Sequence, residues 1–234
     1  MLENTELNQK KYRHEYKYIC SDEQLTLIES RINNLLKIDK HVIEDKKYTI
    51  RSLYFDNYND RCFYENEDGI DPREKFRIRI YNNDDSRISL ELKQKYREKT
   101  HKEAELISRD IVENFIENKI KYNSDFSKLL NKLYILNKKE LMKPVIIVEY
   151  ERVPYVYKEG NVRITLDKNI SSSKDIKNFF NKKISKRPVM SKGYHILEVK
   201  FDEFLPDYIY RNLQLENLQQ IAFSKYYLCR KFSL

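Results

Sequence analysis

The sequence of 234 residues predicts an α+β fold, a closed or nearly closed antiparallel β-barrel tunnel of about eight strands with helices packed outside it. Several short segments alternate between charged and apolar residues, which is typical of strands with two chemically different faces. Other segments repeat apolar residues at the spacing of amphipathic helices. Because neither an internal repeat nor a convincing linker interrupts them, we expect a single domain over 1–234, with its core at about 11–231.

The chain is expected to begin with a strand, a helix and a second strand. The first strand is predicted over 12–20. The helix is predicted over 21–36 and starts with a capping box, because Ser21 stands three residues before Gln24. The segment KYTIRSLYFD predicts the second strand over 47–56.

The strictest alternation lies in the next part of the chain. One face of the strand predicted over 75–81 is basic and consists of Lys75, Arg77 and Arg79. The other face is apolar and consists of Phe76, Ile78 and Ile80. A strand predicted over 87–93 repeats this alternation, and Asp84 and Asp85 suit the turn between the two. A third strand over 101–107 is expected to complete a meander.

The second half of the chain is expected to contain two helices, three strands and a closing helix. These elements are predicted over 109–119, 124–138, 145–152, 162–167, 195–201 and 215–231.

Composition excludes several classes of protein. Three glycines are too few for either of the Gly-rich phosphate loops, GxxxxGK[ST] or GxGxxG. Four scattered histidines without a close pair argue against a histidine metal site. We predict no transmembrane segment, because no apolar run approaches roughly 18 residues, and the polar start is no secretory signal. Three distant cysteines indicate reduced thiols in a cytoplasmic protein.

The charged strand faces point to a possible binding site. A charged face is most often simply the one in contact with water, and this holds for each strand taken alone. The pattern recurs, however, at Glu15/Lys17, Glu91/Lys93, Arg163/Asp167 and Glu198/Lys200. In a barrel one set of faces must point inward, and helices could cover the apolar set. The charged set would then line a tunnel, and a bound polyanion would offset the repulsion between its basic side chains. The forked guanidinium groups of the arginines suit phosphate oxygens.

Seven segments in this order resemble a known family. They are Arg13-His-Glu-Tyr-Lys17-Tyr, Ser52-Leu-Tyr-Phe-Asp56-Asn, Phe76-Arg-Ile-Arg79, Leu90-Glu-Leu-Lys93, Val162-Arg-Ile-Thr-Leu-Asp167, Leu197-Glu-Val-Lys200 and Phe223-Ser-Lys225. Together they resemble the VTC (vacuolar transporter chaperone) polyphosphate polymerase domain, of the triphosphate tunnel metalloenzyme superfamily. The resemblance runs over nearly the whole chain.

The resemblance implies a set of site residues. The implied substrate-binding residues are Lys17, Arg73, Lys75, Arg77, Arg79, Lys93, Lys102, Arg152, Arg163, Lys200 and Lys225. Of these, Arg77, Arg79, Lys93 and Lys200 are implied to be catalytic. Glu198 is implied to bind a divalent metal, Mn²⁺ or Mg²⁺. The chain departs from the family at Asn66 and Ala222, where the family has basic residues.

Three functions stay open at this stage. The first is a metal-dependent polyphosphate polymerase that transfers the terminal phosphoryl group of ATP to a growing chain and releases ADP. The second is a tripolyphosphatase or nucleoside triphosphatase with the same tunnel, and the third is a non-catalytic polyanion-binding module. The expected ligands are ATP, triphosphate or polyphosphate. We do not expect nucleic acid, because the basic residues alternate inward on strands. The resemblance is also compatible with a membrane-protein partner that exports the product.

Overall fold

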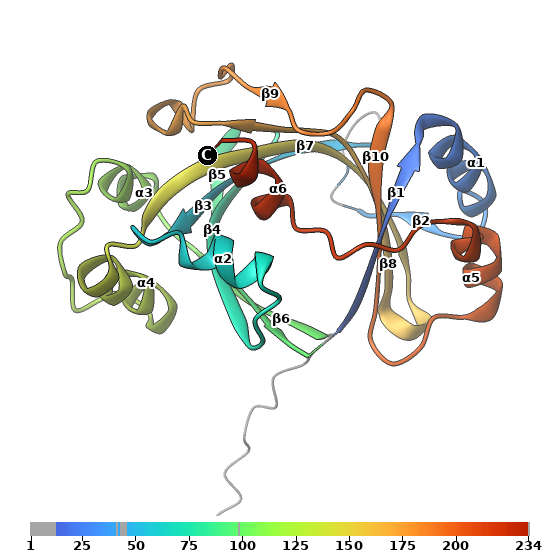
Figure 1. The fold of residues 1–234 in the computed structure, drawn as a ribbon, viewed down its shortest axis with the longest axis horizontal. Coiled ribbons are helices and arrows are strands. Elements are labelled where there is room, and N and C mark those ends of the chain that lie inside the picture. The colour runs from blue at the N-terminus through green and yellow to red at the C-terminus, as the bar shows by residue number, and fades with distance from the viewer. Residues whose placement is uncertain (1–12, 41, 43–45, 98, 234) are drawn as a thin grey trace, which may run out of the picture.

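The computed structural model describes residues 13–40, 42, 46–97 and 99–233, which share one antiparallel sheet (Figure 1). Eight strands form its main path. In the order in which they pair, they are β1 (His14–Ser21), β10 (Tyr194–Phe201), β8 (Val162–Ser173), β7 (Lys143–Tyr157), β3 (Tyr48–Asp56), β4 (Arg73–Tyr81), β5 (Asp84–Tyr96) and β6 (Lys99–Leu106). Two short strands lie off this path, with β2 (Lys37–Ile38) on β7 and β9 (Arg187–Pro188) on β8.

The sheet curls strongly, so that its two edges approach each other. Strand β1 and strand β6 are the two ends of the path. Arg13 and Thr100 form an antiparallel bridge between these ends, with N···O distances of 3.0 and 3.1 Å. Irregular register in the pairings of β3 with β7 and of β7 with β8 adds bends to the longest strands. The prediction of a nearly closed antiparallel barrel of about eight strands is confirmed.

The described residues contain six α-helices and three short 3₁₀ turns. The helices are α1 (Asp22–Ile32), α2 (Arg61–Glu67), α3 (Arg109–Ile116), α4 (Lys128–Glu140), α5 (Asp207–Leu213) and α6 (Lys225–Lys231). The 3₁₀ turns are Glu159–Asn161, Ile176–Asn178 and Leu215–Asn217. Figure 1 shows α3 and α4 at one end of the curled sheet, α1 and α5 at the other, and α2 and α6 in front of it.

Most apolar strand faces point outward and pack against α1, α3, α4 and α5. Ile78 of β4 is fully buried in a cluster with Val112 and Phe115 of α3 and Leu133 of α4. A second outer cluster joins β8 and β10 to α1 and α5. A third cluster joins β3 and β7 to α2 and α6 and lies on the inner face of the sheet, since its Tyr54 is directly opposite Arg77 in the strand register. Helices α2 and α6 thus cover one part of the concave face, and the remaining part is left for polar side chains.

The first helix starts as the sequence predicts and ends earlier. Ser21 Oγ accepts a hydrogen bond from Gln24 N, and Ser21 N donates one to Gln24 Oε1 at 2.9 Å. This is the predicted capping box. The helix ends at Ile32 instead of residue 36. Residues 11 and 12, which the expected core and first strand include, lie outside the described residues.

The prediction of one closing helix over 215–231 is wrong. The structure forms a 3₁₀ turn, a non-helical segment over 218–224 and then α6. The segment runs beside β1, where Ile221 N donates a hydrogen bond to Lys17 O at 2.9 Å and Gln220 bridges Tyr18. An edge strand offers unpaired backbone groups to such a partner, and this pairing replaces the helical hydrogen bonds.

Helices α2 and α5 are not predicted from the sequence. Helix α2 takes its cap from earlier in the chain, since the Asp56 carboxylate accepts hydrogen bonds from Cys62 N at 2.8 Å and Phe63 N at 3.1 Å. Helix α5 has seven residues, too few for a clear apolar period, and buries Ile209 and Leu213 beside α1.

We predict that Ile78→Ala destabilises the protein by about 2–5 kcal/mol, because it leaves a cavity in a fully packed cluster. Urea unfolding of both proteins measures this difference. Ile135→Ala is the matched control, since Ile135 is 42% exposed on α4 and should cost less than about 1 kcal/mol. Equal effects of the two substitutions would mean that the apolar face of β4 is not the packed one.

Candidate functional site

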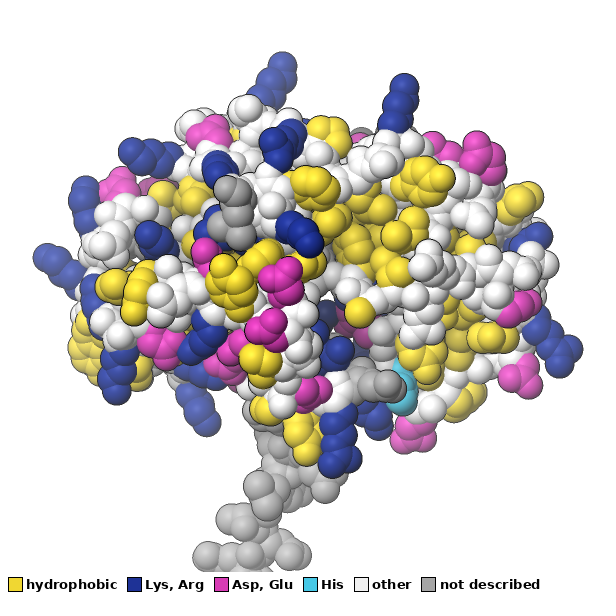
Figure 2. Space-filling view, in the orientation of Figure 1, with side chains coloured by type: hydrophobic (Ala, Val, Ile, Leu, Met, Phe, Trp, Pro, Cys, Tyr) yellow, Lys and Arg dark blue, Asp and Glu magenta, His cyan; other side chains and the backbone are white. Residues whose placement is uncertain are grey.

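The concave face of the sheet holds a cavity of about 480 Å³. Its walls come mainly from β1, β4, β5, β6, β10 and the segment over 221–226. Basic side chains dominate the lining, which includes Arg13, Lys17, Arg73, Lys75, Arg77, Arg79, Lys93, Lys95, Lys102, Arg152, Lys200 and Lys225. Two carboxylates, Glu15 and Glu198, line it with them. Figure 2 shows Lys and Arg side chains inside the hollow at the centre of this face.

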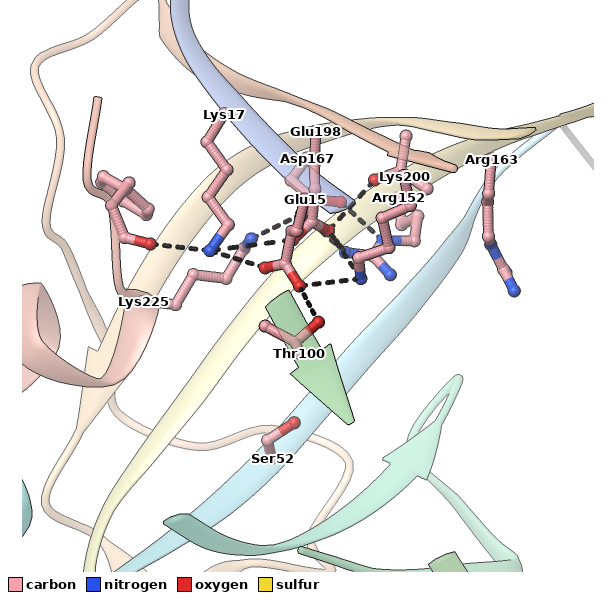
Figure 3. Close-up of polar contacts among 12 residues, drawn as sticks. Glu15, Lys17, Ser52, Thr100, Arg152, Arg163, Asp167, Glu198, Lys200 and Lys225 are labelled. Carbon is pink, nitrogen blue, oxygen red and sulfur yellow. Dashed lines mark hydrogen bonds and ion pairs between the residues drawn. The ribbon is translucent and has the colours of Figure 1, made fainter. Parts of the chain in front are cut away.

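The structure brings together ten of the eleven basic residues that the resemblance implies. Arg163 is the exception. Its guanidinium lies 2.8 Å from Asp39 Oδ2 and 3.2 Å from the Tyr48 hydroxyl, and Figure 3 shows it pointing away from the others. A buried carboxylate thus holds Arg163 outside the cavity lining. The roles of all eleven residues stay predictions.

The floor of the cavity under β4 is organised by one buried carboxylate. Glu91 is 1% exposed, and its Oε2 lies 2.6 Å from Arg77 Nη2 and 3.7 Å from Arg79 Nη1. Lys102 reaches the other oxygen at 3.2 Å. Burial alone would raise the pKa of Glu91, but these three cations hold it well below its ordinary value. Glu91 therefore fixes the direction of both arginines, and Arg79 also donates to Ser52 Oγ at 3.2 Å.

A second carboxylate organises the lysines on β1, β5 and β10. Glu15 lies 2.8 Å from Lys17, 2.7 Å from Lys93 and 3.9 Å from Lys200. It also accepts a hydrogen bond from the Thr100 hydroxyl at 3.2 Å (Figure 3). Burial opposes ionisation of Glu15, yet the three lysines keep its pKa well below the ordinary value. Glu15 is thus an ionised group that spaces three ammonium groups.

A third group joins β7, β8, β10 and α6. Arg152 donates to both oxygens of Asp167, at 2.6 and 2.7 Å, and to Glu198 Oε2 at 3.1 Å. Lys225 of α6 reaches Asp167 at 2.6 Å, and Lys200 reaches Glu198 at 3.3 Å (Figure 3). Burial would raise the pKa of Glu198, but the surrounding cations, Lys200 first, bring it to about 2.

Two tyrosines hold the C-terminal wall in place. The Tyr226 hydroxyl donates a hydrogen bond to the fully buried Asp56, so α6 is tied to the end of β3. Lys75 Nζ lies 5.1 Å from the centre of the Tyr226 ring, and Lys225 Nζ lies 4.9 Å from the centre of the Tyr150 ring. Both distances suit cation–π attraction. The anchored helix positions Lys225 in the cavity.

Sequence reasoning missed three basic residues of the lining. They are Arg13, Lys95 and His101. Lys95 could have been found, because it continues the alternation of Glu91 and Lys93, but the strand was predicted to end at 93 and β5 runs to Tyr96. Arg13 could also have been found, because it stands two residues before Glu15 in the strand predicted over 12–20 and continues the alternation of Glu15 and Lys17.

The donor set suits a hard divalent cation in part. Among residues 13–40, 42, 46–97 and 99–233, no three His, Cys, Asp or Glu side chains gather into a metal-binding group. Glu15 and Glu198 nevertheless share the cavity and the same lysine neighbours, Lys17 and Lys200. Mg²⁺-type ions are commonly held by one or two carboxylates with substrate phosphates completing the shell. These two residues therefore fit a metal that arrives with a phosphate ligand.

A strongly curled antiparallel sheet around a basic cavity defines the triphosphate tunnel class of protein. Within that class, the chain belongs to the VTC domain family, whose model matches residues 12–233. The predicted family is therefore confirmed. Comparison with curated proteins finds no match. Among the residues that the structure describes, no helix is long and apolar enough to cross a bilayer.

Two solved structures share the fold. One is a candidate adenylate cyclase from Bacillus halodurans, with a TM-score of 0.52 and 15% identity over 91% of this chain and 95% of that one. The other, from Hippeastrum, is described as a candidate adenylyl cyclase with a dominant triphosphatase activity. It has a TM-score of 0.52 and 14% identity over 96% of this chain and 97% of that one.

We predict that Arg77→Met destabilises the protein by about 3–5 kcal/mol, because it leaves the buried Glu91 carboxylate without its nearest partner. Chemical denaturation of the single and double variants measures the coupling. Adding Glu91→Gln to Arg77→Met should recover part of the loss, since the uncompensated charge is then removed. An Arg77→Met variant as stable as the wild type would show that the ion pair does not organise this wall.

We predict that Lys75→Met stabilises the ligand-free protein more at pH 6 than at pH 9. Burial, together with Arg73 and Lys17, lowers the pKa of Lys75 from 10.5 to about 7. At pH 6 the folded protein therefore holds a charged, desolvated Lys75. As pH rises through 7 toward 10.5 the folded state releases this proton before the unfolded state does, so the penalty falls. Free energies of unfolding at both pH values test this. Lys121→Met, at an exposed position, is the control, and a gain independent of pH would contradict the prediction.

Proposed function

We propose that this protein is a metal-dependent polyphosphate polymerase that uses ATP as its phosphoryl donor. The observation that carries the proposal is the cavity lining, in which twelve Lys and Arg side chains surround two carboxylates. Such a surplus of confined positive charge favours a polyanionic ligand. Membership of the VTC domain family supports a triphosphate or polyphosphate as that ligand.

The reaction needs no covalent nucleophile from the protein. A terminal oxygen of the polyphosphate attacks the γ-phosphorus of ATP and forms a new P–O bond. The bond from that phosphorus to the β–γ bridging oxygen breaks, and ADP leaves with the electron pair. Catalysis then consists of positioning and of stabilising charge on the transferring phosphoryl group. Arg77, Arg79, Lys93 and Lys200 are the residues assigned to this role, and the carboxylates that orient them keep the arginine and lysine donors preorganised.

Glu198, with Glu15 beside it, is the residue assigned to the divalent cation. When bound, Mn²⁺ or Mg²⁺ would supply charge neutralisation on the phosphate oxygens. In the metal-free protein, Lys17 and Lys200 contact both carboxylates and keep them ionised.

A triphosphatase is the second candidate. It would use the same cavity with water as the acceptor, releasing orthophosphate. The dominant triphosphatase activity ascribed to the Hippeastrum protein of the same fold favours it. A polyanion-binding module without catalysis is the third outcome that the experiment separates.

The deciding experiment incubates the protein with ATP and Mn²⁺ or Mg²⁺. Products are resolved on a gel for polyphosphate, and ADP and orthophosphate are quantified. Chains that lengthen with time, with ADP formed in step, support the polymerase. Orthophosphate alone would identify a triphosphatase, and an unchanged ATP pool with retained polyphosphate binding would leave only a binding module.

We predict that Glu198→Gln abolishes metal-dependent turnover and leaves polyphosphate binding largely intact, because a neutral amide is a poor ligand for a hard cation. Turnover is measured over a series of metal concentrations, and binding by calorimetry without metal. Glu117→Gln, which changes a carboxylate outside the cavity lining, is the matched control. A Glu198→Gln variant with wild-type rates at limiting metal would remove Glu198 as the metal ligand.

A further inference from the structure

The cations of the cavity fall into two groups. Nine of the twelve have a carboxylate within 4.0 Å. The remaining three are Arg73, Lys75 and Lys95, here called the outer basic group. Among the described residues, no carboxylate lies within that distance of any of them.

Two members of the outer basic group have neutral hydrogen-bond partners. Arg73 Nη1 donates to the Ile70 carbonyl oxygen at 2.8 Å. Lys75 Nζ donates to Asn66 Oδ1 at 2.8 Å and to Ser224 Oγ at 3.3 Å. These contacts orient the cations without cancelling their charge. The group is therefore the part of the lining with the least internal compensation.

The strand register places these cations against one another. Arg73 of β4 is directly opposite Lys95 of β5, and Lys75 is directly opposite Lys93. Like charges on opposite cross-strand positions destabilise a sheet. Burial and then Arg73 and Lys17 lower the pKa of Lys95, and the same two cations add to the effect of burial on Lys75. Bound anionic groups would offset this repulsion.

The outer basic group lies toward one end of the cavity wall formed by β4. Arg73 and Arg77 are four residues apart on this strand, which corresponds to roughly 13 Å along the backbone. Between them, Lys75 lies on the same face. A triphosphate held at Arg77 and Arg79 has only three phosphorus atoms and two bridging oxygens, so it is too short to occupy both regions fully. A longer linear polyphosphate chain can occupy both regions.

We propose that Arg73, Lys75 and Lys95 form an outer subsite that binds the phosphate groups of a linear polyphosphate beyond those held at Arg77 and Arg79. This inference rests on the proposed function and adds to it a preference for long chains over triphosphate. The inner subsite is preorganised by carboxylates, whereas the outer subsite gains its counter-charge from the ligand itself.

The test compares two ligands on one pair of substitutions. Dissociation constants for tripolyphosphate and for a size-fractionated long-chain linear polyphosphate are measured by calorimetry without metal. The Arg73→Gln/Lys95→Gln double variant should bind the long chain at least about tenfold more weakly, as expected for loss of charge-assisted contacts. Its affinity for tripolyphosphate should change less than about threefold. Lys121→Gln/Lys177→Gln, which removes the same net charge at exposed positions outside the cavity lining, should preserve the ratio of the two affinities.

Two results would overturn the outer subsite. One is an equal loss of affinity for both ligands in the double variant, and the other is an unchanged affinity for the long chain. Failure of the proposed function has a different signature. A wild-type protein that binds long chains with the predicted dependence on Arg73 and Lys95, but makes none from ATP, would keep the subsite and reject the polymerase. A wild-type protein that binds neither ligand would reject both.

Discussion

The structure depends on four carboxylates that make a basic cavity possible. Each of these carboxylates has a buried side chain and contacts two or more cations. They are Glu15, Glu91, Asp167 and Glu198. Without them, the ammonium and guanidinium groups of six strands and α6 would face one another in a confined space. With them, eight of the twelve cations have a carboxylate that sets their direction, while the lining keeps a surplus of positive charge.

This electrostatic arrangement determines how the sheet is built. In most antiparallel sheets of small proteins one face packs on the core and the other faces water. Here the apolar faces point mainly outward, where α1 with α5 and α3 with α4 bury them in two clusters. Helices α2 and α6 cover apolar residues of β3 and β7 on the inner face. The polar faces line a curled interior. The contact of Arg13 with Thr100 joins the two sheet edges, so closure of the sheet brings the walls of the cavity together.

The fold class and most of the cavity lining could be predicted because both follow from strand alternation. Arg77 and Ile78 must lie on opposite faces of β4, whatever surrounds them. The direction of Arg163 could not be predicted in this way, because it depends on Asp39, a residue distant in sequence whose carboxylate pairs with it. The same is true of the segment over 218–224, which is drawn out of the predicted helix by backbone hydrogen bonding to β1. Alternation predicts which face of a strand a residue lies on. Partners distant in sequence determine the direction in which its side chain points.

We propose that the cavity on the concave face is the binding site for a polyanion. The most direct measurement is a crystal structure of the protein with tripolyphosphate and without added metal. We expect phosphate density in the cavity, in contact with the guanidinium groups of Arg77 and Arg79. Tripolyphosphate bound only on the outer surface, for instance at Lys182 and Lys183, with the cavity cations still paired to their carboxylates, would contradict this proposal.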